Sequence, residues 1–288
     1  MENFPIIDLT RLSSLKKKDL GEGMYCRVSL VDWYGTPLVE KVSKHPASES
    51  QTFEREVEYL HALDGAGGAP QLVSVFSSPP TIVCTFKGYR TLYDFLERGG
   101  IPDKMYPMVA IRIAERLQEV HAVGIVHNDL KTDNVMLEVS KKHKNGFEVS
   151  IIDYGLACFY GRSLGRTGKA DHVAPEVRTG GVSVYESDVY SLGVLLQDLT
   201  DEICDPTVFH VLNCIGVWAS HPQVWDRPSL DTLLEELRKE ASTHGWDTRQ
   251  FPVSRGCCLC RVWKGLKRGA RSAWKHLRRM GRRLVGRR

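Results

Sequence analysis

Residues 127–134 read HNDLKTDN and residues 153–155 read DYG. Asp129 can accept a proton from an incoming hydroxyl group. Asn134 and Asp153 can each offer an oxygen atom to a hard cation such as Mg²⁺, which prefers oxygen ligands. The two stretches therefore predict one site that handles both protons and a metal ion.

Short runs that look like strands frame the first stretch. Residues 124–126 read GIV before it, and residues 135–137 read VML after it. Functional loops are commonly held in place by rigid elements on both sides. The pattern favours an anchored functional loop over a polar surface loop.

These stretches resemble the protein-kinase catalytic loop H-R-D-L-x-x-x-N, followed by D-F-G. The resemblance implies that Asp129 orients and deprotonates the acceptor hydroxyl and that Lys131 supports the transferring phosphoryl group. It implies that Asn134 and Asp153 hold Mg²⁺ ions that bridge the phosphates of ATP. The implied catalytic residues are Asp129, Lys131 and Asn134, and the implied metal ligands are Asn134 and Asp153. A lysine at position 131 is typical of serine/threonine kinases.

Residues 20–28 read LGEGMYCRV and resemble the glycine-rich loop G-x-G-x-x-G-x-V, with Cys26 in place of the third glycine. Glycine lets the backbone approach phosphate oxygens closely, although a lone G-x-G also fits a simple hairpin turn. The resemblance implies a set of ATP-binding residues: Leu20, Gly21, Gly23, Val28, Lys41, Glu56 and Cys84.

Lys41 falls where the family places the lysine of V-A-I-K. A buried ammonium group needs a paired anion, and in the family a helix glutamate supplies it. Glu56 has the spacing that the family shows, and Glu54 is the alternative if the register slips by two residues. Cys84 would lie at the back of the adenine pocket, or be a core cysteine.

Further motifs follow in the family's order. Residues 173–176 read VAPE, and Glu176 would form the family's structural ion pair with Arg227. Residues 187–193 resemble the central helix of the second lobe, in which Asp188 would hydrogen-bond the catalytic loop. The resemblance covers roughly residues 20–240.

The chain departs from the family pattern at several positions. Asn128 replaces the arginine that pairs with a phosphorylated activation loop, which suggests activity that does not await phosphorylation. Tyr154 replaces the phenylalanine of D-F-G, and its hydroxyl needs a partner if buried. Lys169 or Thr167 occupies the region where serine/threonine kinases place a threonine beside the catalytic aspartate. The missing arginine and the compact segment also fit small-molecule kinases, whereas Glu176 and its motif favour a protein substrate.

The periodicity of the sequence predicts unlike halves. Strands are expected within residues 20–44, around a turn at residues 34–37, and again at residues 71–76 and 81–86. Helices are expected at residues 48–63, 92–97, 104–123, 190–199 and 230–240. The predicted fold is α+β: a bilobal protein-kinase-like fold with a small β-rich N-lobe and a larger α-helical C-lobe. The expected units are a lead-in (1–19), a kinase domain (20–245, N-lobe about 20–87, C-lobe about 88–245) and a tail (255–288).

Charge separates that tail from the rest of the chain. Of 39 Lys and Arg, 13 lie in residues 255–288, which contain no Asp or Glu. Residues 1–254 hold the other 26 and all 35 acidic residues, a net charge of −9. Tryptophans and leucines recur near helical spacing in the tail, so an anionic membrane surface is its expected partner. Cys257, Cys258 and Cys260 are candidates for acylation; nucleic acid or a calmodulin-like protein are the alternative partners.

Composition indicates an ordinary globular chain of 288 residues, with 42% hydrophobic and 26% charged residues. No apolar run approaches the roughly 20 residues that span a bilayer, and the scattered cysteines indicate a reducing compartment. We expect a cytoplasmic location, at a membrane surface through the tail, with the nucleus as alternative, and a monomeric catalytic domain.

The combined expectation is an ATP- and Mg²⁺-dependent kinase that phosphorylates serine or threonine in protein substrates. The alternative is a pseudokinase scaffold tethered by its basic tail, which Asn128, Cys26 and Lys169 favour. Against it stands the full set of Lys41, Glu56, Asp129, Asn134 and Asp153.

Overall fold

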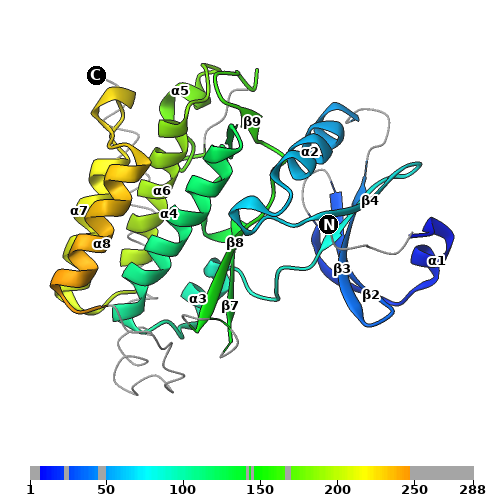
Figure 1. The fold of residues 1–288 in the computed structure, drawn as a ribbon, viewed down its shortest axis with the longest axis horizontal. Coiled ribbons are helices and arrows are strands. Elements are labelled where there is room, and N and C mark those ends of the chain that lie inside the picture. The colour runs from blue at the N-terminus through cyan, green and yellow to red at the C-terminus, as the bar shows by residue number, and fades with distance from the viewer. Residues whose placement is uncertain are drawn as a thin grey trace.

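A computed structural model describes residues 7–22, 26–44, 50–140, 143, 146–165 and 170–246. The first part forms a five-stranded sheet with a helix beside it, and the second part is mostly helical (Figure 1). This is the predicted bilobal α+β architecture, which is thereby confirmed. The basic tail at residues 255–288 lies outside the described residues. Within the described ranges, no helix has the length and apolar character needed to cross a bilayer.

The N-lobe sheet is antiparallel, with strand order β1-β2-β3-β5-β4. The strands are β1 (Lys17–Glu22), β2 (Cys26–Trp33), β3 (Thr36–Ser43), β4 (Leu72–Ser77) and β5 (Pro80–Thr85). The turn between β2 and β3 falls where the sequence predicts it. Tyr34 and Gly35 both have positive φ, 52° and 85°, as a two-residue hairpin turn of the twist-compatible type requires.

Alternation along β3 divides the sheet into two faces. Leu38 and Glu40 lie on the outer face, whereas Val39 packs in the core between sheet and C-lobe. Because successive side chains point to opposite faces, Lys41 falls on the same inner face as Val39. The carboxylate of buried Glu40 is paired on its own face with Lys17 Nζ, at 2.6 and 2.8 Å.

A short helix covers the outer face of the sheet. Helix α1 (Leu9–Ser14) lies in the stretch expected as a lead-in, and β1 begins at Lys17, before the expected domain start. Asp8 caps the helix by accepting a hydrogen bond from Thr10 N at 3.0 Å. A small second core forms there from Ile7, Leu12, Val31, Trp33, Leu38 and Val83.

Truncating the centre of this outer core is expected to destabilise the protein. Leu12 is fully buried, so Leu12→Ala should lower the free energy of unfolding by at least about 2 kcal/mol. Thr10→Ala, at an exposed position of the same helix, should stay within about 0.5 kcal/mol of wild type. Urea denaturation followed by tryptophan fluorescence measures both, and equal midpoints for Leu12→Ala and wild type would show that α1 does not stabilise the sheet.

Helix α2 (Ser50–Leu63), which the periodicity predicts at residues 48–63, packs on the inner face of the sheet. Its buried residues Tyr59, Leu60 and Leu63 pack with Ile82 of β5. They belong to the principal core, the largest cluster of buried apolar side chains among the described residues, which continues into the helices of the C-lobe. The helix ends at residues that need positive φ, including Gly65 at 90°.

The C-lobe is built around α4 (Tyr106–Ala122), whose apolar face is fully buried. The other helices are α3 (Leu92–Arg98), α5 (Pro175–Arg178), α6 (Tyr185–Thr200), α7 (Pro206–Ala219) and α8 (Leu230–Thr243). Figure 1 shows α4, α6, α7 and α8 side by side at the end of the molecule opposite α1. The four helices predicted after residue 88 are present, with α6 starting earlier than expected, and α5 and α7 were not predicted.

Four short strands lie between α4 and α5 along the chain and form two antiparallel pairs. Strand β6 (Ile125–Val126) pairs with β9 (Cys158–Phe159), and β7 (Val135–Val139) pairs with β8 (Phe147–Ile151). They form the frame predicted around residues 127–134, so that stretch is a loop anchored at both ends.

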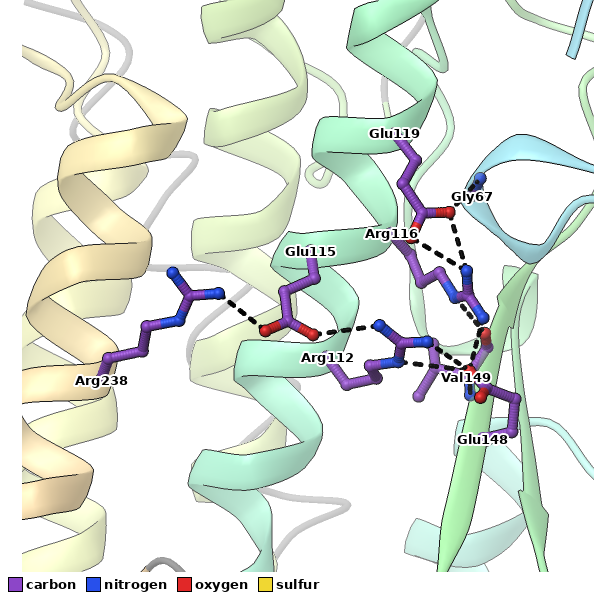
Figure 2. A network of polar contacts seen from close by, with 8 residues as sticks. All are labelled: Gly67, Arg112, Glu115, Arg116, Glu119, Glu148, Val149 and Arg238. Atoms are coloured by element: carbon purple, nitrogen blue, oxygen red, sulfur yellow. Dashed lines mark hydrogen bonds and ion pairs between the residues drawn. The ribbon is translucent and has the colours of Figure 1, made fainter. Parts of the chain in front are cut away.

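A polar network joins the two lobes beside this frame (Figure 2). Glu119 on α4 accepts a hydrogen bond from Gly67 N at 2.9 Å, in the turn that follows α2. Arg116 pairs with Glu119 at 2.7 Å and with Glu148 of β8 at 2.7 Å. A Cβ atom at Gly67 would lie 2.4 Å from the Val120 side chain, so only glycine allows this close approach. The network fixes the end of α2 against α4.

Candidate active site

Asp188 on α6 holds the backbone of the loop at residues 127–134. One carboxylate oxygen accepts from His127 N at 2.7 Å and the other from Asn128 N at 2.8 Å. His121 Nε2 lies 2.9 Å from Asp188 Oδ2. The carboxylate is fully buried, and these partners satisfy it as a buried charge requires. The loop therefore starts from a fixed position, by the contact that the sequence predicts.

Asn128 ties the loop to the segment that follows Asp153. Its φ is 63°, a left-handed conformation that asparagine tolerates better than most residues. Its side-chain nitrogen donates to Leu156 O at 3.2 Å and lies 3.2 Å from Cys158 Sγ. The residue is buried, so a neutral side chain here makes direct contacts inside the protein.

Asp129 is surrounded by hydrogen-bond donors. Its Oδ2 atom accepts from Lys131 Nζ at 2.8 Å and from Asn134 Nδ2 at 2.8 Å. Its Oδ1 atom lies 2.7 Å from Nε2 of His172. Burial alone would raise the pKa of Asp129, but the hydrogen bonds from His172 and Lys131 outweigh it and lower the pKa to about 2. The carboxylate is therefore ionised and able to accept a further hydrogen bond at neutral pH.

Lys41 of β3 forms the second part of the site. Its Nζ atom lies 2.5 Å from Glu56 Oε1 of α2 and 3.5 Å from Asp153 Oδ1. Of the two glutamates weighed from the sequence, Glu56 faces Lys41, whereas Glu54 is exposed. Burial would lower the pKa of Lys41, but the charges of Glu56 and Asp153 raise it well above its ordinary value. Lys41 is therefore a fixed positive charge.

Asp153 stands between the two parts. Its φ is 67°, and its side chain is half exposed. The charge of Lys41 lowers the pKa of Asp153, and His127 lowers it further. Burial and the charge of Asp129 raise it, but the net shift is downward. Two ionised carboxylates, Asp129 and Asp153, thus share one site and remain charged at neutral pH.

The donor set fits a magnesium ion. Both hydrogen bonds of the Asn134 side chain to Asp129 use its nitrogen atom, which leaves its amide oxygen for a cation. Asp153 adds an ionised and accessible carboxylate. Carboxylate and amide oxygens are the ligands that Mg²⁺ takes, usually few in number beside substrate phosphates.

The remaining residues that the sequence predicts as ATP contacts lie on strands of the N-lobe sheet, where the structure describes them. Leu20 and Gly21 are exposed on β1, Val28 lies opposite Gly21 on β2, and Gly23 is outside the described residues. Cys84 is buried on β5, opposite Val39. Val28 also pairs with Lys41 of β3, so the described residues of the glycine-rich segment lie on β2, next to Lys41, and on its neighbour β1.

Cys26, at the position of the missing third glycine, is half buried close to this centre. Burial raises the pKa of its thiol, and the negative charges of Glu56 and Asp153 raise it further. The positive charge of Lys41 acts in the opposite direction but does not cancel the rise. The thiol is therefore protonated at neutral pH.

Tyr154 is fully buried in place of the family's phenylalanine. Its ring packs edge-on against His127, with centroids 4.9 Å apart. In the described part of the chain its hydroxyl has no hydrogen-bond partner, although the sequence led us to expect one. Burial raises the pKa of this hydroxyl far above its usual range.

Glu176 and Arg227 form the predicted ion pair. The guanidinium group binds both carboxylate oxygens at 2.8 Å. It also donates to the carbonyl oxygens of His221, Glu186 and Pro222, so that all five of its N–H groups are used. The pair ties α5, and the segment leading to it, to the body of the C-lobe.

His172 was missed from the sequence. No motif marked it, because its role depends on a fold that returns residue 172 to residue 129. Lys169 and Thr167, which were considered for this place, lie outside the described residues.

The sequence matches a family model and several known proteins. A family model described as a protein kinase domain matches residues 15–207. Similar proteins include the serine/threonine-protein kinase CTR1 of Arabidopsis thaliana, 27% identical over 267 residues, covering 77% of this chain. The atypical protein kinase C of Drosophila melanogaster is 27% identical over 194 residues, covering 62% of this chain. The chain spans only 31% of the length of each of these two relatives.

Proposed function

We propose, from the premise that this chain belongs to the protein kinase family, that it transfers the γ-phosphate of ATP to serine or threonine hydroxyls of protein substrates. One observation carries the proposal. Lys41, paired with Glu56, comes within 3.5 Å of Asp153, while Asp129 and Asn134 are hydrogen-bonded to each other in the same site. These are the groups that phosphoryl transfer needs for positioning and for charge stabilisation.

The residues divide the work as follows. Lys41 holds the phosphates of ATP, and its pairing with Glu56 keeps the ammonium group in place. A bound Mg²⁺ ion, held by Asn134 and Asp153, would neutralise charge on the phosphates. The acceptor oxygen attacks the γ-phosphorus while its proton passes to Asp129, and ADP leaves.

Lys131 is placed to act on the transferred group. Its ammonium lies 2.8 Å from Asp129 Oδ2, and its side chain is one-third exposed. A cation beside the base can stabilise negative charge on the phosphoryl oxygens. A lysine at this position is typical of serine/threonine kinases, and the names of the similar proteins favour the same acceptor class.

Asn128 supports activity that does not await phosphorylation. In the family, an arginine at this position pairs with a phosphate on the activation segment. Here the Asn128 side chain itself bonds to Leu156 O in that segment. The link between catalytic loop and segment is therefore made by neutral hydrogen bonds that need no added charge.

A peptide array tests the acceptor class. Purified protein with ATP and Mg²⁺ should label serine- and threonine-containing peptides, and replacement of the acceptor by alanine should abolish the label. Asp129→Asn protein on a duplicate array is the matched control. Labelling of tyrosine peptides alone would refute the serine/threonine assignment, and a blank array for both proteins would favour a pseudokinase scaffold.

A further inference from the structure

His172 bonds directly to the proposed base. Its Nε2 atom lies 2.7 Å from Asp129 Oδ1, and its side chain is 21% exposed. Because an ionised carboxylate can only accept, the Nε2 atom must carry the proton and donate it. The imidazole is therefore an oriented donor to one oxygen of Asp129.

The backbone around His172 is held on both sides. The Tyr190 hydroxyl of α6 donates to Asp171 O at 3.4 Å, and Val173 N donates to Ala170 O at 3.1 Å. Arg178 of α5 lies 3.8 Å from the Asp171 carboxylate. The imidazole is thus presented to Asp129 by a segment anchored on α5 and α6.

A count of lone pairs shows what this contact does. A carboxylate offers about four acceptor positions, two on each oxygen. Lys131 and Asn134 take both positions on Oδ2, and His172 takes one on Oδ1. Among the described contacts, one acceptor position remains, on Oδ1 next to the imidazole.

We propose that His172 is a positioning residue for the acceptor: it fixes the plane of the Asp129 carboxylate so that the substrate hydroxyl binds Oδ1 beside the imidazole ring. The inference rests on the proposed function and deepens it. The donors on Oδ2 hold one edge of the carboxylate, and His172 holds the other. With both edges held, the free lone pair has one direction.

Removal of the ring should therefore slow transfer without weakening nucleotide binding. Lys41 and Asp153, which face ATP, do not contact His172 among the described hydrogen bonds and ion pairs. Errors of about 1 Å in the placement of reacting groups can cost 100-fold in rate. A carboxylate freed on one edge should move by less than this and lose less rate. We therefore expect His172→Ala to lower kcat about 10-fold or more, with an unchanged dissociation constant for ATP.

The test uses three variants of the full chain, assayed with an array-selected peptide at saturating ATP and Mg²⁺. His172→Gln keeps a side-chain nitrogen donor and should recover most of the lost kcat, whereas His172→Ala should not. Arg238→Ala removes a half-exposed ion pair of α8 that touches neither His172 nor Asp129, and it should keep the wild-type kcat. Thermal shift with ATP measures nucleotide binding in parallel.

Each outcome decides the matter. A wild-type kcat for His172→Ala would overturn the inference and leave the proposed function standing. If the Gln and Ala variants lose activity equally while melting as wild type does, the nitrogen donor is not the acting group and the inference is also wrong. No transfer by wild type itself would refute the proposed function, and the inference with it.

Discussion

Asp129→Asn is expected to lower phosphate transfer by about 10³-fold, within the range of 10² to 10⁴ that general bases contribute. The amide is nearly the same size but cannot take the proton of the acceptor hydroxyl. Three donors now face Asp129, from Lys131, Asn134 and His172. A carboxamide has only one acceptor oxygen. Its NH2 group therefore faces another hydrogen-bond donor at the other edge of the side chain.

Nucleotide binding should survive this substitution, since Lys41, Glu56 and Asp153 are unchanged. Transfer of labelled phosphate to an array-selected peptide measures the first effect, and stabilisation against heat by ATP and Mg²⁺ measures the second. Loss of ATP binding together with transfer would indicate a collapsed site rather than a missing base. Thermal melting without nucleotide separates these cases: an intact site should lose only about 1–3 kcal/mol for the one unpaired donor, whereas a collapsed site should lose much more.

Arg227→Ala is expected to have the largest effect on stability, a loss of about 3 kcal/mol or more, because removing one partner of a buried ion pair leaves the other uncompensated. The Arg227 side chain is completely buried, and its partner Glu176 is one-fifth exposed. The substitution also leaves three carbonyl oxygens without their donor.

Thermal melting of the purified protein measures this loss, at roughly 2–4 °C per kcal/mol for a chain of this size. Arg238→Ala is the matched control: its pair with Glu115 is 2.8 Å long but half exposed, so its loss should cost at most about 1 kcal/mol. Similar melting temperatures for the two variants would show that the Glu176–Arg227 pair does not stabilise the C-lobe.

Most of the centre could be predicted because short motifs in the sequence resemble those of the kinase family, and local structure then agrees with them. Strand alternation puts Lys41 on the inner face with Val39, and a helical period brings Glu56 to the same side. The family's spacing favoured Glu56, but the sequence alone could not exclude Glu54, because the choice depends on how α2 is rotated against the sheet. Packing of Tyr59 and Leu60 into the principal core fixes that rotation.

Helix α7 shows where periodicity fails. It is apolar nearly all round, so no polar face marks the helical period. Its buried residues are Val208, Val211, Leu212, Ile215 and Ala219, and its exposed ones include Phe209, Val217 and Trp218. A signal was present at its start: Asp205 caps the helix and Pro206 takes its first position.

His172 shows a second limit. It lies 43 residues from Asp129 along the chain, and only the return of the segment before α5 brings the two together. Local sequence carries no record of such a contact. The contact between Asp188 and the catalytic loop is also distant in sequence. It could be predicted because Asp188 lies in a motif that resembles one of the family's.

The central claim is that Lys41 and Asp153 hold a nucleotide whose terminal phosphate faces Asp129. The most direct measurement is transfer of labelled γ-phosphate from ATP by the purified chain, with and without Mg²⁺, compared with Asp129→Asn. The account predicts transfer by wild type that requires Mg²⁺ and falls about 10³-fold in the variant. Equal labelling by the two proteins, or none by wild type with Mg²⁺ present, would contradict it.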